Sequence, residues 1–431
     1  MTASRRDFVR NAALAGAAFA FPGAEWLEAA ARPGPVEPLR PLPPEAAADE
    51  AYWRRVRDQF LLSPNGIYFN TGTVGASPRM VLDAVVKHMT AFETVFDARG
   101  VDVEVLRRSV GALLGVPAAT LAFTRNTTES MSWIAGGLDL QPGDEVLMTT
   151  HEHVGGMCPW QAAARRRGLV LTQLPLPVPP PSSGAVMDAW RGAICPHTRV
   201  MMISHVLFTN GLIQPVKELC ALARERGIIT AIDGAHPPGM LQLNLADLGC
   251  DFYASSPHKW LLAPKGNGLL YVSEAWVDRL WPTIVSGGWD ALQDKAVRFD
   301  RKGTVNESLL AGFQAAVDFH TLIGPERVER RIRWLADRLY DGLARLPGVQ
   351  LKSATDAALR APMISFTVRG MTTDDLIRAL WERGTVRVRH VAEYDYHWVR
   401  LSTHVYNTPD EVDRVVALVA ELGGWRTQSA G

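Results

Sequence analysis

The sequence has no surplus of charge of either sign. Its 431 residues include 45 lysines and arginines and 45 aspartates and glutamates, so the formal net charge is zero. A protein that binds the phosphate backbone of nucleic acids needs a basic surplus, which this chain lacks. Hydrophobic residues make up 47% and charged residues 21%, a composition that excludes a disordered or fibrous chain. At about 100–200 residues per domain, the length predicts two or three domains.

Cysteine is scarce as well. The four cysteines form no C-x-x-C pair, which argues against a structural zinc site; they are Cys158, Cys195, Cys220 and Cys250. Four cysteines are also too few for a disulfide scaffold in a chain of this length. We therefore expect free thiols and no bound metal.

The N-terminus has only a short apolar run, over residues 12–21, well below the ~20 residues that span a bilayer. Arg5, Arg6 and Phe8 precede this run and an alanine triplet at 29–31 follows it, the order typical of a twin-arginine (Tat) export signal. The alternative is an ordinary amphipathic helix. We predict a signal peptide over residues 1–31, a proline-rich linker over 32–50, and a periplasmic or otherwise exported mature protein.

From residue 51 onward, strand-like and helical segments alternate. Apolar strands are predicted over 145–149, 199–204, 228–232, 248–254 and 268–272, with a helix over 216–226. Strands separated by helices form a mostly parallel sheet, and ligands bind beyond the carboxyl ends of such strands. We predict a large α/β domain over residues 51–305.

The pattern changes after residue 305. We expect a smaller α+β domain over 306–431, with the N-terminal segment of the large domain packed on it. Its predicted elements are a long helical region over 307–346, strands over 362–368 and 386–388, and a helix over 373–383.

Two charged residues fall at or just past predicted strand ends, Asp233 and Lys259. Lys259 has apolar neighbours, including Trp260 and Leu261, which lower the pKa of an amine and suit Schiff-base formation. Asp233 is placed to pair with a pyridinium nitrogen and keep it protonated. These two residues point to pyridoxal 5′-phosphate (PLP), although Lys259 taken alone would be read as a surface lysine.

A phosphate site is predicted nearby. Thr127 and Thr128 open a predicted helix, where hydroxyls and peptide N–H groups suit a phosphate. The same Thr-Thr-Glu sequence is also a capping box, and the two interpretations are compatible.

Several motifs in this order resemble the class V aminotransferase family, the fold-type I enzymes that use PLP, and in particular its isopenicillin N epimerase-like branch. The resemblance extends from about Tyr68 to Val415. The motifs are Tyr-Phe-Asn-Thr-Gly-Thr-Val-Gly from Tyr68, Asn126-Thr127-Thr128-Glu129, Glu152-His153, Asp233-Gly-Ala-His236, Ser256-Pro-His258-Lys259, Lys302-Gly303-Thr304 and the segment from Arg400 to Asn407. The resemblance implies a large domain with a seven-stranded, mostly parallel sheet, PLP as the cofactor, and a homodimer.

The resemblance also implies residue roles. Lys259 matches the lysine that forms the Schiff base with PLP, Asp233 the partner of the ring nitrogen, and His153 the aromatic ring stacked on the cofactor. Four polar side chains match positions around the phosphate: Thr127, Thr128, Ser256 and His258.

Further positions match residues at the edge of the cofactor. His236 lies where many relatives have a glutamine near the ring hydroxyl, and it would act there or on the substrate. Asn210 borders the cofactor or, alternatively, forms a turn with Gly211. Thr304 matches a residue that reaches the phosphate of the neighbouring subunit.

Three arginines are candidates for substrate binding. Arg400 matches the arginine that binds the substrate α-carboxylate. Arg387 and Arg389 alternate on one predicted strand and would bind a second anionic group, or else form a solvated face.

No cysteine follows Cys250, so cysteine desulfurase chemistry lacks the small-domain thiol that the resemblance requires. The remaining reactions begin with removal of the substrate α-proton, for which Lys259 is the natural base. We expect an aminotransferase that acts on an amino acid or an amine-bearing peptide. An epimerase or C–S lyase is the alternative, and a catalytically inactive periplasmic binding or scaffold protein is the non-enzymatic one.

Overall fold

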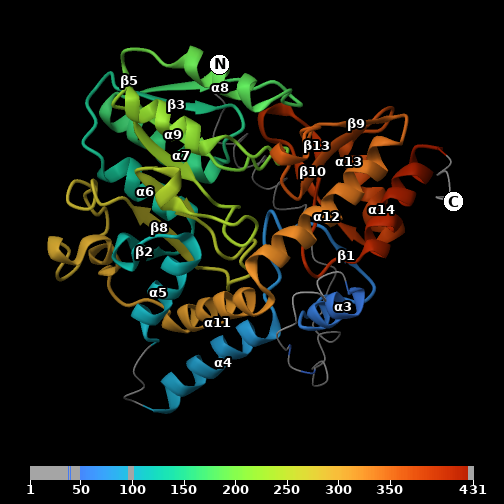
Figure 1. The fold of residues 1–431 in the computed structure, drawn as a ribbon, viewed down its shortest axis with the longest axis horizontal. Helices are drawn as coiled ribbons and strands as arrows, with labels where there is room; N and C mark the ends of the chain where they lie inside the picture. The colour runs from blue at the N-terminus through green and yellow to red at the C-terminus, as the bar shows by residue number, and fades with distance from the viewer. Residues whose placement is uncertain (1–36, 38, 40–48, 96–100, 426–431) are drawn as a thin grey trace, which may run out of the picture. The chain divides into compact units, whose positions relative to one another are not determined.

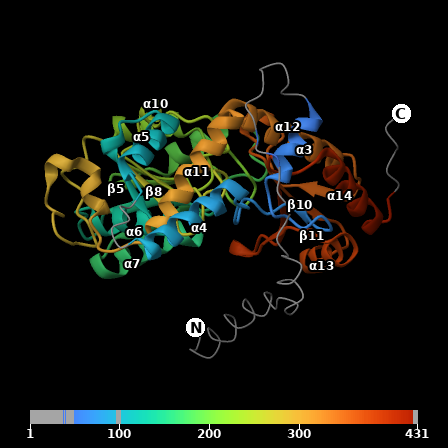
Figure 2. The same cartoon turned by 90° about the horizontal axis from the view of Figure 1, so that it is seen from below.

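The computed structural model describes residues 37, 39, 49–95 and 101–425. The predicted signal peptide and nearly all of the predicted linker lie outside the described residues. The chain from Leu39 onward forms one compact unit. Within this unit, the middle of the chain surrounds one sheet and the C-terminal part surrounds another (Figures 1 and 2).

The larger sheet has seven strands in the order β2-β8-β7-β6-β5-β3-β4. Its strands are β2 (Leu121–Thr124), β3 (Glu145–Thr149), β4 (Val170–Leu174), β5 (Thr198–Ser204), β6 (Ile229–Asp233), β7 (Phe252–Ser255) and β8 (Gly268–Val272). Neighbours from β7 to β4 are parallel, and β8 runs antiparallel to both β7 and β2. The predicted mostly parallel α/β fold is therefore confirmed.

Both faces of this sheet are buried. Met201 and Ile203 of β5 pack into one cluster of buried side chains, while Val200 and Met202 pack into another. Helices α4 (Arg79–Thr94), α5 (Val103–Leu114), α8 (Ser183–Ala193), α9 (Val216–Glu225) and α11 (Glu307–Ile323) contribute to the first cluster, and α6 (Thr127–Gly137) and α7 (Val154–Arg167) to the second. Strands covered on both faces read as continuous apolar runs, which made these segments recognisable in the sequence.

The strand predicted over 248–254 begins later, at Phe252. Leu248 is the last residue of a short helix, α10 (Leu245–Leu248), which Asn244 caps by accepting a hydrogen bond from the Asp247 N–H. Gly249 then ends that helix with a φ of 67°. The prediction was wrong here because an apolar run does not by itself separate a helix end from a strand start.

The second sheet has four antiparallel strands in the order β12-β13-β10-β9. They are β9 (Val349–Leu351), β10 (Met363–Val368), β12 (Arg389–Val391) and β13 (Trp398–Ser402). Helices α12 (Pro325–Ala344), α13 (Thr373–Gly384) and α14 (Pro409–Leu422) pack on it through one cluster of buried side chains.

The helical region predicted over 307–346 consists of two helices, α11 and α12. Gly324, with a φ of 97°, separates them, and Pro325 is the first residue of α12. Phe313 and Ala316 of α11 belong to a core cluster of the seven-stranded sheet, and α11 lies along α4 (Figure 1). Helix α11 thus packs with the seven-stranded sheet, and the domain boundary after residue 305 stays a prediction.

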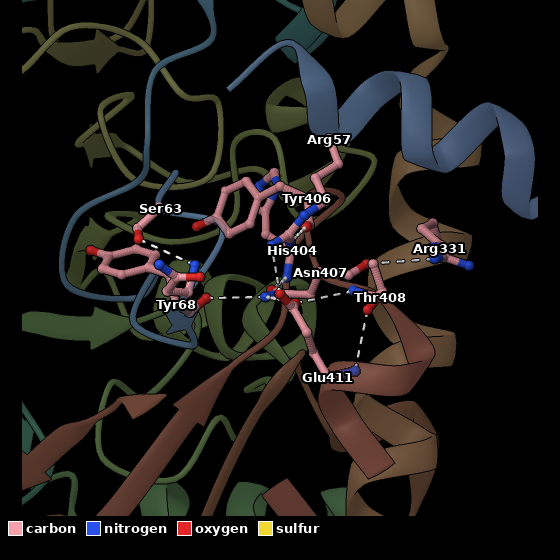
Figure 3. A network of polar contacts seen from close by, with 10 residues as sticks. Arg57, Ser63, Tyr68, Arg331, His404, Tyr406, Asn407, Thr408 and Glu411 are labelled. Carbon is pink, nitrogen blue, oxygen red and sulfur yellow. Dashed lines mark hydrogen bonds and ion pairs between the residues drawn. The ribbon is translucent and has the colours of Figure 1, made fainter. Parts of the chain in front are cut away.

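The N-terminal segment packs on the C-terminal part. Strand β1 (Ile67–Tyr68) pairs in parallel with β11 (Val386–Arg387), and Ile67 joins the buried cluster of the second sheet. Figure 3 shows the polar network that adds to this contact: Arg57 of α3 (Glu50–Asp58) pairs with Glu411 at 2.7 Å, and the Asn407 amide donates to the Tyr68 carbonyl at 3.1 Å.

Among the helices of the described residues, none combines the length and apolar character that a membrane span requires. The four cysteines are unpaired, with Cys158 exposed and both Cys220 and Cys250 buried. Within the described ranges, no three metal-ligating side chains of the His, Cys, Asp and Glu types come together.

A buried ion pair joins α5 to the segment that follows β8. Arg107, whose side chain is 2% exposed, lies 2.7 Å from the Asp300 carboxylate. Asp300 also accepts a hydrogen bond from the Phe123 N–H of β2, at 2.6 Å. Glu104 also contacts Arg107, at 3.1 Å, and Lys302 also acts on Asp300, but the loss of either charge would remove the other's nearest counter-charge.

We predict that Arg107→Met lowers the free energy of unfolding by about 3 kcal/mol, because it removes the nearest counter-charge of the Asp300 carboxylate. Chemical denaturation would measure the change. The matched control is Lys217→Met, since Lys217 and its partner Asp247 are 58% and 59% exposed, and it should cost less than about 1 kcal/mol. Equal losses in the two variants would contradict this account.

Candidate active site

A cavity of about 270 Å³ opens beyond the carboxyl ends of the parallel strands. Ser204 and Asp233 line it from the ends of β5 and β6, and His153 and Ser256 from just past β3 and β7. Ten of the predicted site residues line this cavity: Thr127, Thr128, His153, Asp233, His236, Ser256, His258, Lys259, Arg389 and Arg400.

Lys259 extends from a buried apolar segment. Trp260, Leu261 and Leu262 are at most 3% exposed. His404, at the centre of the network in Figure 3, contacts the Trp260 carbonyl at 3.0 Å and ties this segment to the C-terminal part. Burial lowers the pKa of Lys259 to about 8, with Asp233 opposing the shift. At pH 7 roughly a tenth of the amine is thus neutral and nucleophilic, far more than for an ordinary lysine.

Asp233 lies buried at the carboxyl end of β6. Its Oδ1 accepts a hydrogen bond from the Ala235 N–H at 3.0 Å, while burial raises its pKa and Lys259 lowers it. Gly156 of α7 allows the close approach, since a Cβ there would lie 2.6 Å from Oδ2 of Asp233. Any larger residue would displace the carboxylate.

The N-terminus of α6 forms a second polar wall. Asn126 caps the helix by accepting from the Glu129 N–H at 2.9 Å. The Thr127 hydroxyl lies 2.8 Å from the Ser256 hydroxyl, and the Thr127 N–H donates to the same oxygen at 3.1 Å. Hydroxyls gathered at a helix N-terminus, where the dipole is positive, form a site that suits a phosphate.

His153 is held in one orientation. Its Nδ1 accepts a hydrogen bond from the Gly155 N–H at 3.0 Å and caps α7, and its ring meets Phe208 edge to face at 5.0 Å. Burial and the nearby Lys259 lower the pKa of His153 to about 3. The ring is therefore neutral, with its proton on Nε2.

His236 is neutral as well. Its Nδ1 accepts a hydrogen bond from the Trp260 indole at 3.0 Å, and burial holds its pKa well below the usual value. Its Nε2 is buried and has no partner within the described part of the chain. Since His236 lines the cavity, this N–H is a donor available to a bound group.

Arg400 is a buried cation on β13, 1% exposed. Its guanidinium donates to the Phe208 carbonyl at 2.6 Å and to the Thr73 hydroxyl at 3.2 Å, and among the described residues it forms no ion pair. Gly72 gives it room, since a Cβ there would lie 2.8 Å from Nη2. An unpaired buried guanidinium suits a carboxylate ligand.

Three predicted residues lie outside the cavity wall. The Asn210 side chain accepts from the Leu212 N–H at 3.1 Å, which is the turn that we kept as the alternative. Thr304 is exposed in the segment before α11. Arg387 and Arg389 do not share one strand: Arg387 belongs to β11, exposed beside β1, and only Arg389 of β12 reaches the cavity.

Glu152 is a buried residue whose role we did not predict. It accepts hydrogen bonds from the Thr149 hydroxyl at 2.7 Å and from the Ser204 hydroxyl, and burial raises its pKa to about 7. Ser204 is in register with Asp233, so Glu152 braces the strand end behind that aspartate. The Glu-His pair in the sequence was the signal available.

Comparison with known proteins assigns the chain to a family. The aminotransferase class-V family matches residues 76–415. Isopenicillin N epimerase from Streptomyces clavuligerus is 33% identical over 394 residues, which cover 87% of this chain and 99% of that protein. A probable cysteine desulfurase from Xylella fastidiosa is 28% identical over 407 residues, which cover 86% of this chain and 95% of that protein.

Solved structures of PLP-dependent enzymes also match the fold of this chain. A C-DES variant with glycine covalently linked to its PLP cofactor superposes with a TM-score of 0.76 at 26% identity, covering 85% of this chain and 99% of that one. The cystine C–S lyase C-DES with its product cysteine persulfide gives 0.74 at 25% identity, covering 83% and 98%.

The cavity fits PLP group by group. It offers a lysine for the aldehyde, a buried carboxylate for the ring nitrogen, a fixed imidazole for the ring face, and hydroxyls at a helix N-terminus for the phosphate. The unpartnered N–H of His236 is a further donor without a protein acceptor. Sequence, fold and cavity thus agree, and the chain belongs to the class-V aminotransferase family of PLP-dependent enzymes.

Proposed function

We propose that this enzyme removes the α-proton of an amino acid or an amine-bearing peptide and transfers the amino group. The observation that carries the proposal is the presence of Lys259 and the unpaired Arg400 in one cavity with Asp233. In a substrate with an amine and a carboxylate on one carbon, the carboxylate would pair with Arg400 and the proton on that carbon would be taken by Lys259.

The cofactor and the protein would divide the work. When bound, PLP supplies an aldehyde for the substrate amine and an electron-withdrawing ring. Asp233, His153 and the hydroxyls of Thr127 and Ser256 would hold it. Arg400 would orient the substrate carboxylate, and the Lys259 Nζ, once neutral, would accept the proton from Cα.

The basic groups of the cavity favour amino-group transfer. Lys259 has a pKa of about 8, whereas the histidines that line the cavity titrate far below neutrality. Transfer requires one base that takes up a proton and returns it on the same face. Epimerisation requires a proton on the opposite face as well, which neutral imidazoles of such low pKa supply poorly.

Epimerisation remains the second candidate because isopenicillin N epimerases at 33% and 34% identity match this chain over nearly their whole length. Cysteine desulfurase activity is not proposed. Among the described residues that line the cavity there is no cysteine, and none follows Cys250 in the sequence.

We predict that Lys259→Ala abolishes covalent cofactor attachment and lowers turnover by roughly 10³-fold, since no other base replaces it. Visible absorbance and mass spectrometry after borohydride reduction would detect the attachment. Lys265→Ala is the matched control, because Lys265 lies in the same loop but does not line the cavity. Attachment that persists in Lys259→Ala would refute the assignment. A wild-type protein that binds PLP yet converts no donor would favour the scaffold alternative.

Amino-group transfer needs a keto acceptor, whereas epimerisation does not. We predict that the wild-type enzyme converts an amino donor repeatedly to its keto product only when a keto acceptor is present; without an acceptor, at most one keto product forms per active site. Chiral chromatography of the donor pool should show no inversion without an acceptor. Inversion at Cα in ²H₂O without an acceptor, with deuterium incorporated, would instead establish an epimerase.

We also propose export through the Tat pathway, supported by the order of Arg5, Arg6, Phe8 and the apolar run. Replacement of Arg5 and Arg6 by lysine should retain the protein in the cytoplasm, as measured by cell fractionation. Unchanged export of the double variant would contradict the proposal. A homodimer in which Thr304 reaches the partner's cofactor stays a prediction.

A further inference from the structure

Two arginines face each other across neighbouring strands of the small sheet. Arg389 of β12 is in register with Arg400 of β13, and both line the cavity. Like charges placed directly opposite each other on a sheet repel, and burial strengthens the repulsion. The two arginines therefore need negative charge nearby.

Glu393 acts on both arginines but pairs directly with only one of them. Glu393 forms an ion pair with Arg389, and their side chains are 22% and 20% exposed. Arg400 is more deeply buried and pairs with no carboxylate of the described residues. The cavity thus contains one arginine in a direct ion pair beside one that Glu393 stabilises only through space.

The segment that carries Glu393 is fixed on the large domain. Tyr394 donates to the Glu152 carbonyl at 2.9 Å, and Tyr396 stacks between Trp398, at 4.3 Å, and His151, at 4.8 Å. Left-handed backbone at Tyr394, with a φ of 56°, is unfavourable for a bulky residue and persists only where the surroundings impose it. Glu393 is therefore held in place beside Arg389.

We infer that Glu393 is a positioning residue that makes the site selective for amines with a single carboxylate, the one bound by Arg400. The inference rests on the proposed function and names its substrate class. A ligand with a second carboxylate would have to displace Glu393 from Arg389 and leave a half-buried anion unpaired. For Arg389 the sequence leaves open a second anionic group of the substrate or a solvated face; in the structure it pairs with the protein's own Glu393.

The test compares two achiral, unreactive probes that differ in one charge, succinamate and succinate. Calorimetric titration of the PLP-loaded protein gives both dissociation constants. We expect the wild-type protein to bind succinamate at least about tenfold more tightly than succinate. Glu393→Gln frees Arg389, so it should shift this ratio at least about tenfold toward succinate while changing succinamate affinity by less than about twofold.

Three variants complete the design. Glu393→Gln combined with Arg389→Met should abolish the gain for succinate, because the freed cation is gone. Glu421→Gln is the matched control: it makes the same chemical change at Glu421 of α14, which forms an exposed ion pair with Arg383 of α13. It should leave the ratio of the two dissociation constants unchanged. Arg400→Met should weaken both probes at least about tenfold.

The outcomes separate the two ideas. If both probes require Arg400 but Glu393→Gln leaves their ratio within about twofold of wild type, the selectivity inference is wrong and the proposed function stands. If Arg400→Met weakens neither probe, the carboxylate site of the proposed function fails and the inference fails with it. If Glu393→Gln keeps the succinamate affinity and the melting temperature of the wild-type protein, a changed ratio cannot be due to misfolding. The Glu393→Gln, Arg389→Met double variant then checks that the gain for succinate depends on Arg389.

Discussion

The active-site cavity contains more buried positive than negative charge, and much of the structure serves to support that imbalance. Lys259, Arg389 and Arg400 line it, opposed by Asp233 in the wall and Glu393 behind Arg389. Buried charges are stable only when they are paired and hydrogen-bonded. The surplus suits a cofactor phosphate and a substrate carboxylate, which are both anions.

Burial, reinforced by the same cations, keeps the histidines around them neutral. Burial, together with Lys259, lowers the pKa of His153 to about 3 and of His258 to about 4, so these rings carry no charge that would add to the surplus. Each ring also has one nitrogen engaged by the protein, which fixes where its proton lies. Fixed neutral donors can orient a ligand without any need for them to titrate.

The cavity depends on contacts between segments far apart in the chain. Residues 72–75 run between Lys259 and Arg400, with the Gly75 N–H donating to the His258 carbonyl at 2.9 Å. The network of Figure 3 anchors the neighbouring Tyr68 to Asn407, and His404 in the same network contacts the backbone beside Lys259. A shift of the C-terminal part would therefore move Arg400 and the Lys259 segment together.

Local sequence determined the fold class and the principal chemistry. Continuous apolar runs identified the parallel strands because those strands are buried on both faces. Asp233 and Lys259 could be placed because strand ends in such sheets meet at one edge, where ligands bind. The short-range motifs also indicated the phosphate-binding end of the site, since a helix N-terminus and its hydroxyls are encoded within a few residues.

Tertiary structure decided what depends on distant partners. The separation of Arg387 from Arg389 follows from a change of pairing strand, and the break at Gly324 assigns α11 to the large-domain layer. Arg389 pairs with Glu393, which lies in a segment whose Tyr394 contacts the Glu152 carbonyl from a distant part of the chain. The sequence identifies the arginines, but it does not show which of them has a carboxylate partner. That depends on which groups the fold brings together, because electrostatic energy depends on distance and burial.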